Sequence, residues 1–303
     1  MAGFCLMLAA CTSDDSNEPV VPDTSETPEA PIDPTRPRVN IISRAEGGAA
    51  DTAVPLQAGL YMVNYLDGKP DELLPTDNYV NNQLMTWTDD AWSTSTPIYW
   101  NGMDTRADFY AYAPYSASVD DARQLPISVN TDQRTDEAFT QSDFLWGMVQ
   151  GQTPTTEGFN LTLSHLLSQL TVVVTAEAGF DANELQASDV SVTIGGTRTS
   201  ATADVQTGVI TIDQKATAQD VRCHTNGDLS YTAVLLPQQV PFANLIQVDW
   251  RGNKYTLQNS FTLEGRRQYT LTVKLKKTKS GFDIGIDGWD ILPEDFGGTI
   301  GGE

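Results

Sequence analysis

The residue with the clearest chemical signature in this sequence is Cys11. An apolar run that starts at Phe4 and ends in the small residues Ala9 and Ala10 comes directly before it. This order is typical of a bacterial lipoprotein signal, which a peptidase removes just before a lipid-modified cysteine. A run of about ten apolar residues is also too short to cross a bilayer core. We therefore expect residues 1–10 to be removed and Cys11 to carry a lipid. Because no Lys or Arg precedes Cys11, we expect the natural start to lie upstream of Met1.

Side chains suited to catalysis are few. His165 and His224 are the only histidines, so a catalytic triad or a histidine metal site would have to use them. Cys223 and His224 are adjacent, and on a strand their side chains would point to opposite faces, which excludes a thiolate–imidazole pair. The common nucleotide, zinc-protease and hydrolase signatures are absent. The sequence predicts no catalytic residue, no metal site and no cofactor, although its many acids leave a carboxylate pair for glycoside hydrolysis open.

The charge of the chain limits its partners. A net charge of −22 argues against nucleic acid, whose binding depends on Lys and Arg. Residues 12–35 contain seven acids, five prolines and no Lys or Arg, and they offer little apolar surface to bury. We expect residues 11–36 to form a disordered acidic tether. The acidic run from Ser13 to Ser16 also resembles a signal for the outer face of the outer membrane, so we expect a surface-exposed outer-membrane lipoprotein.

Short alternating runs bounded by Gly, Pro, Asn and Asp recur throughout the remaining chain and predict an all-β fold. Cys223 is the only thiol after Cys11, so no intramolecular disulfide can form and stability must come from packed cores. A glycine turn, Arg251-Gly252-Asn253, predicts a hairpin. The predicted strands are Gly59 to Leu66, Ala107 to Tyr112, Leu170 to Ala176, Val190 to Ile194, Val209 to Asp213, Ser230 to Leu236, Leu245 to Trp250, Lys254 to Leu257 and Tyr269 to Lys277.

The chain after the tether is long enough for two domains of ordinary size. A polar, turn-forming stretch from Gln150 to Gly158 separates two apolar strands and suggests the boundary. We expect two tandem β-sandwich domains, at residues 37–158 and 159–303.

A group of aromatic residues in the first half has two interpretations. It could be a stacking platform for sugars, or, as is more common, it could fill a sandwich core. The group consists of Trp87, Trp92, Tyr99, Trp100, Phe109, Tyr110, Tyr112 and Tyr115.

A set of motifs, in order along the chain, resembles the fimbrillin family, the type V pilins of Gram-negative bacteria. They follow the lipoprotein signal and the tether, and one of them contains His165, for which packing is the expected role. The motifs are Thr96 to Trp100, Ala107 to Tyr115, Thr131 to Gln133, Ser142 to Trp146, Leu161 to Val172, Gly265 to Leu271 and Ile286 to Trp289.

The resemblance implies two transthyretin-like sandwich domains and assembly with other fimbrial subunits by strand exchange. It also implies a trypsin-like maturation protease that cuts after an Arg and releases the leader with its first strand. Here Arg44, followed by Ala45, is the expected site, and Val39 to Ser43 is the expected strand; Pro37 should protect Arg36. For the donor strand, Phe282, Ile284 and Ile286 alternate with polar residues or Gly, which suits pairing at a groove. These residues could equally close the second sandwich of their own chain.

Three functions remain open from the sequence. The first is a structural or accessory subunit of a surface fimbria, matured after Arg44, with a host or bacterial surface ligand as a further partner. The second is a surface-exposed glycan-binding lipoprotein that uses Trp87 and Trp92. The third is a hydrolase. Its only support is the large number of acidic residues, among which the sequence indicates no particular pair.

Overall fold

The fold is known from a computed structural model that describes residues 36–41, 57–66, 69, 71–88, 91–176, 180–181, 184–277, 284–286 and 291–295. Strands dominate these residues, which confirms the predicted all-β class. The short helical elements are η1 (Ala122–Gln124), α1 (Asp136–Ser142) and η2 (Ala187–Asp189). No helix in the described ranges is both long and apolar enough to cross a membrane.

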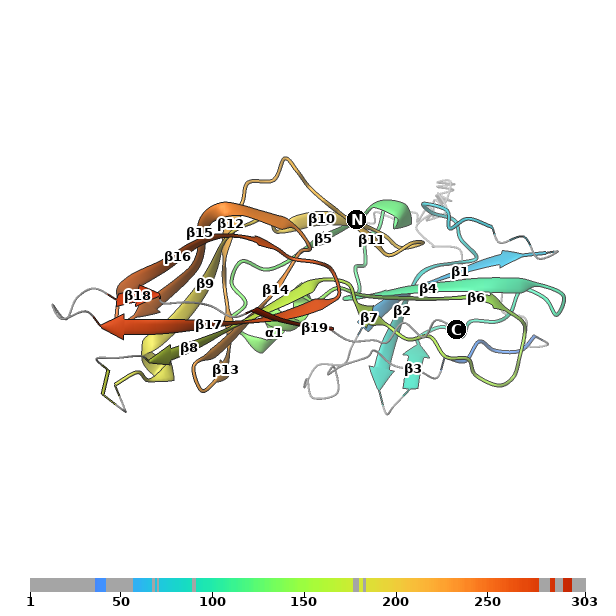
Figure 1. Ribbon diagram of the computed structural model, residues 1–303. Helices are drawn as coiled ribbons and strands as arrows, with labels where there is room; N and C mark the ends of the chain where they lie inside the picture. The colour runs from blue at the N-terminus through green and yellow to red at the C-terminus, as the bar shows by residue number, and fades with distance from the viewer. Residues whose placement is uncertain are drawn as a thin grey trace, which may run out of the picture.

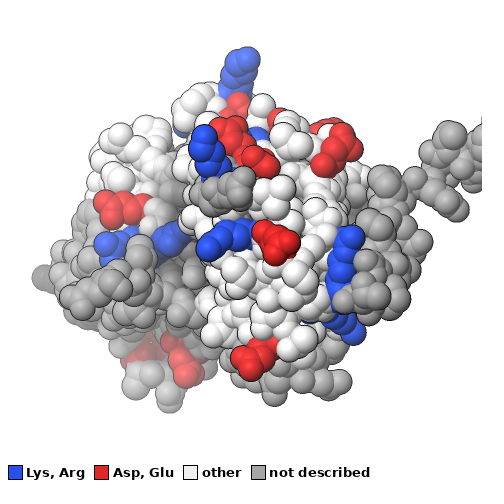
Figure 2. All heavy atoms as spheres, turned by 90° about the vertical axis from the view of Figure 1, so that its right-hand side faces the viewer, with Lys and Arg blue, Asp and Glu red and all other residues white. Residues whose placement is uncertain are grey.

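The first half of the chain forms one six-stranded sheet, with strand order β3-β2-β1-β4-β6-β7, on the right of Figure 1. Neighbouring strands are antiparallel. The strands are β1 (Gln57–Tyr65), β2 (Val80–Thr88), β3 (Ala91–Thr94), β4 (Arg106–Ala113), β6 (Leu145–Gln152) and β7 (Ser164–His165). Viewed end-on, this half shows scattered charges of both signs separated by uncharged surface (Figure 2).

This first sheet is buried on both faces. Phe109 of β4 joins one apolar cluster, and its neighbour Tyr110 joins another on the opposite face. Leu60 and Tyr61 of β1 divide in the same way. Successive side chains of a strand point to opposite faces, so a central strand covered on both sides must be apolar throughout. The motif from Ala107 to Tyr115 therefore supplies two cores at once.

The second half builds a sandwich from two sheets, on the left of Figure 1. One has the order β12-β9-β15-β16, and the other has the order β13-β14-β8-β17-β18 with β19 also paired to β17. Val172 of β8, Ile194 of β9 and Val273 of β17 lie in the core between them. The strands are β8 (Ser168–Ala176), β9 (Val190–Thr197), β12 (Gln219–Arg222), β13 (His224–Gly227), β14 (Ser230–Leu235), β15 (Gln239–Trp250), β16 (Asn253–Thr262), β17 (Arg267–Lys277), β18 (Ile284–Ile286) and β19 (Ile291–Asp295).

A third sheet connects the two halves. Strand β5 (Leu125–Ser128) pairs with β10 (Ser200–Asp204), which pairs with β11 (Val209–Ile212). Its buried residues, Leu125 from the first half and Ala203 from the second, share a cluster with Tyr110. The expected boundary near residue 158 stays a prediction; strand pairing continues across it.

Two side chains tie the halves together. Gln133 is fully buried, and its amide accepts a hydrogen bond from the Val234 N–H at 2.9 Å and donates one to the Val234 carbonyl at 2.8 Å. The side-chain amide of Gln133 therefore makes the two hydrogen bonds with β14 that the backbone of a neighbouring strand would make. The indole Nε1 of Trp146 donates to the Val205 carbonyl at 2.7 Å, and Gly208 lies against its ring. Both residues belong to motifs that the sequence analysis singled out.

The predicted hairpin turn is confirmed. Arg251 and Gly252 have φ angles of 52° and 82°, the two positive values of a type I′ turn between β15 and β16. Predicted and observed strands overlap throughout, with β8 and β17 each beginning two residues before the expected start.

Candidate functional site

A candidate site lies where residues 36–41 meet the first half of the fold. The Val39 N–H donates to the Ile98 carbonyl at 2.8 Å, and the Trp100 N–H donates to the Pro37 carbonyl at 3.0 Å. On the other side, the Phe159 N–H donates to the Asn40 carbonyl at 3.1 Å. Residues 37–41 therefore lie as a short strand between the segments around residues 99 and 159, with bridges to both.

The side chains of this segment alternate as a strand requires. Arg38 and Asn40 are exposed, whereas Val39 and Ile41 are only 9% and 8% exposed. The buried pair belongs to the same apolar cluster as Leu60 on the sheet. Residues that precede the expected cleavage site thus form part of the core of the first half.

Aromatic rings form much of this core. Trp100 is fully buried and meets Phe109 edge-to-face, with ring centroids 5.6 Å apart. Phe159 packs against Phe109 at 4.5 Å. Both Trp100 and Phe159 also pair through their backbones with the inserted segment. The rings and the inserted strand therefore stabilise one another.

An open recess lies beside the inserted strand. A recess of about 300 Å³ runs along the segment. Apolar side chains contribute much of its lining, namely Val39, Ile41, Leu60, Met85, Trp92 and Ile98. A strand with larger side chains than Val39 and Ile41 could occupy more of this space.

The two arginines near this segment are engaged with the fold. Arg36 donates to the backbone carbonyl of Asn101, and Arg38 forms a bridge with Tyr99. A protease needs an accessible extended segment, so pairing at Arg38 opposes a cut there. Among the arginines before β1, that argument and Pro37 leave Arg44 as the best candidate.

Several predicted site residues lie outside the described part of the chain: Cys11, Arg44, Ala45 and Phe282. Ile284 and Ile286 lie in β18, where their backbones pair with Lys277 and Leu275 of β17. Strand β19 pairs with the other end of β17. The structure therefore places the predicted donor on the second sandwich and the inserted strand on the first sheet.

The cysteine and histidines occupy separate environments. Cys223 is buried in the core of the second half, and burial raises the pKa of its thiol far above its ordinary value. The His224 ring instead packs on Phe139, with its Nε2 2.8 Å from an oxygen of Asp136. His165 is 5% exposed, with its Nδ1 2.6 Å from Asp143. No group of three or more potential metal ligands occurs within the described ranges.

Half of the predicted aromatic group is core. Trp100, Phe109, Tyr110 and Tyr112 are at most 1% exposed and cannot stack on a sugar. Trp87 and Trp92 are half-buried cross-strand neighbours whose rings meet edge-to-face at 5.3 Å. Edge-to-face packing stabilises the β2–β3 hairpin.

Comparison with known proteins assigns the chain to a family. The family model described as fimbrillin-like matches residues 44–289. The chain belongs to the fimbrillin-like family. It is 23% identical over 310 residues to a Bacteroides uniformis protein named "Putative fimbrium subunit Fim1C", covering 98% of this chain and 95% of that protein.

Two solved structures share the fold of this fimbrillin-like chain. A "putative cell adhesion protein" from Bacteroides uniformis has a TM-score of 0.62 at 21% identity and covers 87% of this chain and 98% of its own. A protein with the same description from Bacteroides ovatus has a TM-score of 0.64 at 18% identity, with coverages of 86% and 96%.

Sequence reasoning missed the partners of the inserted strand. Ile98 and Trp100 lie in one of the motifs, but nothing local indicates that they pair with residues 37–39. The only available signal was composition: Thr96 to Trp100 and Phe159 to Leu163 are apolar segments bounded by polar turns, as strand partners would be.

Proposed function

We propose that this protein is a structural or accessory subunit of a cell-surface fimbria, exported as a lipoprotein through Cys11 and cut after Arg44 by a trypsin-like protease. The cut prepares the subunit for strand exchange with other fimbrial subunits. The observation that carries the proposal is the burial of Val39 and Ile41 in the core of the first half. Family membership and the fimbrium subunit name of a relative support the fimbrial role.

Cleavage would change how the inserted strand is held. Before the cut, residues 37–41 are covalently attached on both sides, so their local concentration at the groove is high. Afterwards only noncovalent contacts hold the released segment to the fold. These are a few backbone hydrogen bonds, side-chain hydrogen bonds of Arg36 and Asn40, and the buried side chains of Val39 and Ile41, each of which contributes about 1.5 to 3 kcal/mol. The family match, which begins at residue 44, does not include this strand.

An incoming strand would have more to bury than the outgoing one. Phe282, Ile284 and Ile286 present three apolar side chains at alternate positions, compared with Val39 and Ile41. The open volume beside the inserted strand suits the larger set. To act as donor, β18 must first leave β17, to which it pairs through three residues.

The N-terminus of the assembled subunit tests this proposal. We expect fibres sheared from cells to contain chains that start at Ala45. Arg44→Ala should abolish that terminus and the incorporation of the subunit, while the matched variant Arg38→Ala leaves both unchanged. A terminus at lipidated Cys11 in assembled fibres, or normal assembly of the Arg44→Ala variant, would contradict cleavage after Arg44.

A further inference from the structure

A recess in the second half opens where β12 leaves the edge of β9. The last contacts along this edge are the pairing of Arg222 with Thr193 and a hydrogen bond from the Cys223 N–H to the Val192 carbonyl, at 2.9 Å. The chain then crosses to the other sheet as β13. Beyond Val192, no strand among the described residues covers this edge of β9. A recess of about 400 Å³ results, which is within the usual range for small-molecule sites.

Three cations from three segments line this recess. Arg134 comes from the loop before α1 in the first half, Arg222 from β12 and Lys254 from β16. Only one carboxylate, Asp249, is among the lining residues. The lining residues therefore include more cations than carboxylates, although the chain has a net charge of −22, and Asp132 and Asp220 contact lining residues from outside the recess.

Asp132 positions the two arginines without neutralising both. Arg134 donates to its two carboxylate oxygens from Nε at 2.7 Å and from Nη2 at 2.6 Å. The Nη1 of Arg222 lies 3.7 Å from one of the same oxygens. Within the described ranges, the Arg222 guanidinium donates no hydrogen bond, and its side chain is 59% exposed. One carboxylate thus faces two guanidiniums, and the guanidinium N–H groups of Arg222 remain available to another acceptor.

Backbone hydrogen bonds fix the position of the Arg222 main chain. Its N–H donates to the Thr131 carbonyl at 2.8 Å, and its carbonyl accepts from the Gln133 N–H at 3.0 Å. Because Gln133 is itself anchored to β14, the backbones that carry the two arginines are held by the same contacts that join the halves of the molecule. The arrangement is preorganised, which lowers the entropic cost of binding a ligand.

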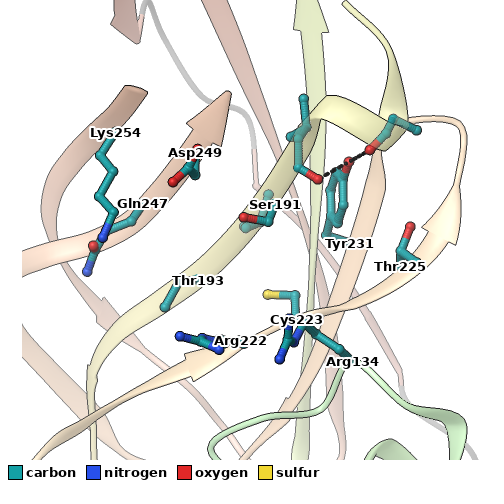
Figure 3. Close-up of a pocket in the computed structure, with 13 residues that line it drawn as sticks. Arg134, Ser191, Thr193, Arg222, Cys223, Thr225, Tyr231, Gln247, Asp249 and Lys254 are labelled. Atoms are coloured by element: carbon teal, nitrogen blue, oxygen red, sulfur yellow. Dashed lines mark hydrogen bonds between the residues drawn. The ribbon is translucent and has the colours of Figure 1, made fainter. Parts of the chain in front are cut away.

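Polar uncharged groups complete the lining. Ser191 and Thr193 alternate along β9 and project from one face of it, and Gln247 of β15 pairs directly opposite Thr193. Figure 3 shows Ser191 and Thr193 between Lys254 on one side and the two arginines on the other, with Gln247 beside Lys254. The Gln247 amide also donates to Asp220 at 3.3 Å. Hydroxyl and amide groups flanked by guanidiniums match a ligand that carries both hydroxyls and an anion.

We propose that this recess binds an acidic sugar residue, with its carboxylate held by the Arg222 guanidinium and its hydroxyls facing Ser191, Thr193 and Gln247. Arg134, whose Nε and Nη2 bind Asp132, adds positive charge beside Arg222. Guanidinium groups bind carboxylates through two parallel hydrogen bonds. The size of the recess admits one monosaccharide unit. The recess shares no lining residue with the recess beside residues 37–41.

Titration of the full chain with sodium glucuronate, followed by calorimetry or NMR, tests this assignment. We expect saturable binding that weakens with added salt and no saturable binding of glucose. Arg222→Gln should weaken binding at least tenfold. The matched control Arg267→Gln, which makes the same charge change on the other sheet, should alter affinity less than twofold.

Thermal unfolding should confirm that the Arg222→Gln variant folds. Lys254→Gln supplies a second test, in which we expect the affinity for glucuronate to fall several-fold. Absence of saturable glucuronate binding would overturn the proposal, as would equal binding of glucose. Inorganic phosphate binding as tightly as glucuronate would show a general anion site and would also overturn the sugar assignment.

Discussion

The two halves of this molecule complete their cores differently. The second half closes its sandwich with its own strands, and residues 170–275 supply every buried member of that core. The first sheet depends on other segments for both faces. Val39 and Ile41, together with residues 98–100 and 159–163, cover one face, and β5 with β10 and β11 cover the other. A core that relies on a short terminal segment can be opened by one proteolytic cut, whereas a core closed by its own strands cannot.

The largest loss of stability should come from removing the Gln133 side chain, which joins the two halves. In Gln133→Ala, the buried N–H and carbonyl of Val234 lose their partners, which costs about 2 to 6 kcal/mol at about 1 to 3 kcal/mol for each group. Urea denaturation should show this loss, with the first half unfolding before the second. The exposed Gln141→Ala serves as the control. A loss below about 1 kcal/mol would show that Gln133 does not tie the halves together.

Matched isoleucine substitutions sharpen the comparison. Ile246→Ala in the second core and Ile41→Ala in the inserted strand should each cost about 2 to 5 kcal/mol, with the fully buried Ile246 at the upper end. Hydrogen exchange should locate the effect of Ile41→Ala in the first half and that of Ile246→Ala in the second. Asn40→Ala, at an exposed position of the same strand, should change stability by less than about 0.5 kcal/mol. Exchange changes spread equally over both halves would contradict independent cores.

The smallest effect concerns pH and reports on the second core alone. Burial raises the pKa of Cys223 in the folded state, so above about pH 8.5 the unfolded chain releases a proton that the folded chain retains. Stability should therefore fall as pH rises above 8.5, by at most about 1.4 kcal/mol per pH unit. Urea unfolding at pH 8, 9 and 10 should show a shallower loss for Cys223→Ala. Identical slopes for both proteins would rule out this contribution.

Local sequence patterns predicted the strands whose side chains alternate clearly, such as β17, where Leu271, Val273 and Leu275 face the core. They missed β5 and β10, because Pro126 and the small residues of Ser200 to Asp204 give weak alternation. They also missed α1, although Thr135 caps it and Asp136 and Glu137 occupy its first turn. The helix has seven residues, about two turns, and its apolar residues Ala138 and Phe139 are adjacent, so no helical period could be detected.

The site was only partly predictable for a related reason. The resemblance and the β-prone residues of Val39 to Ser43 indicated a strand, but its partners lie near residues 99 and 159, and pairing over such separations leaves no local signal. The arginine pair of the recess is brought together by the contact of Thr131 to Gln133 with Arg222, which is equally distant in sequence. Register and long-range pairing come from the packed fold.

Hydrogen exchange before and after cleavage at Arg44 tests the central claim most directly. The Trp100 and Phe159 amides donate to carbonyls of the inserted strand. Cleavage followed by removal of the released leader should abolish their protection, leave β8, β9 and β15 unchanged, and allow a peptide spanning residues 281–300 to restore it. Unchanged protection of Trp100 and Phe159 after removal of the leader, or equal loss in both halves, would contradict the account.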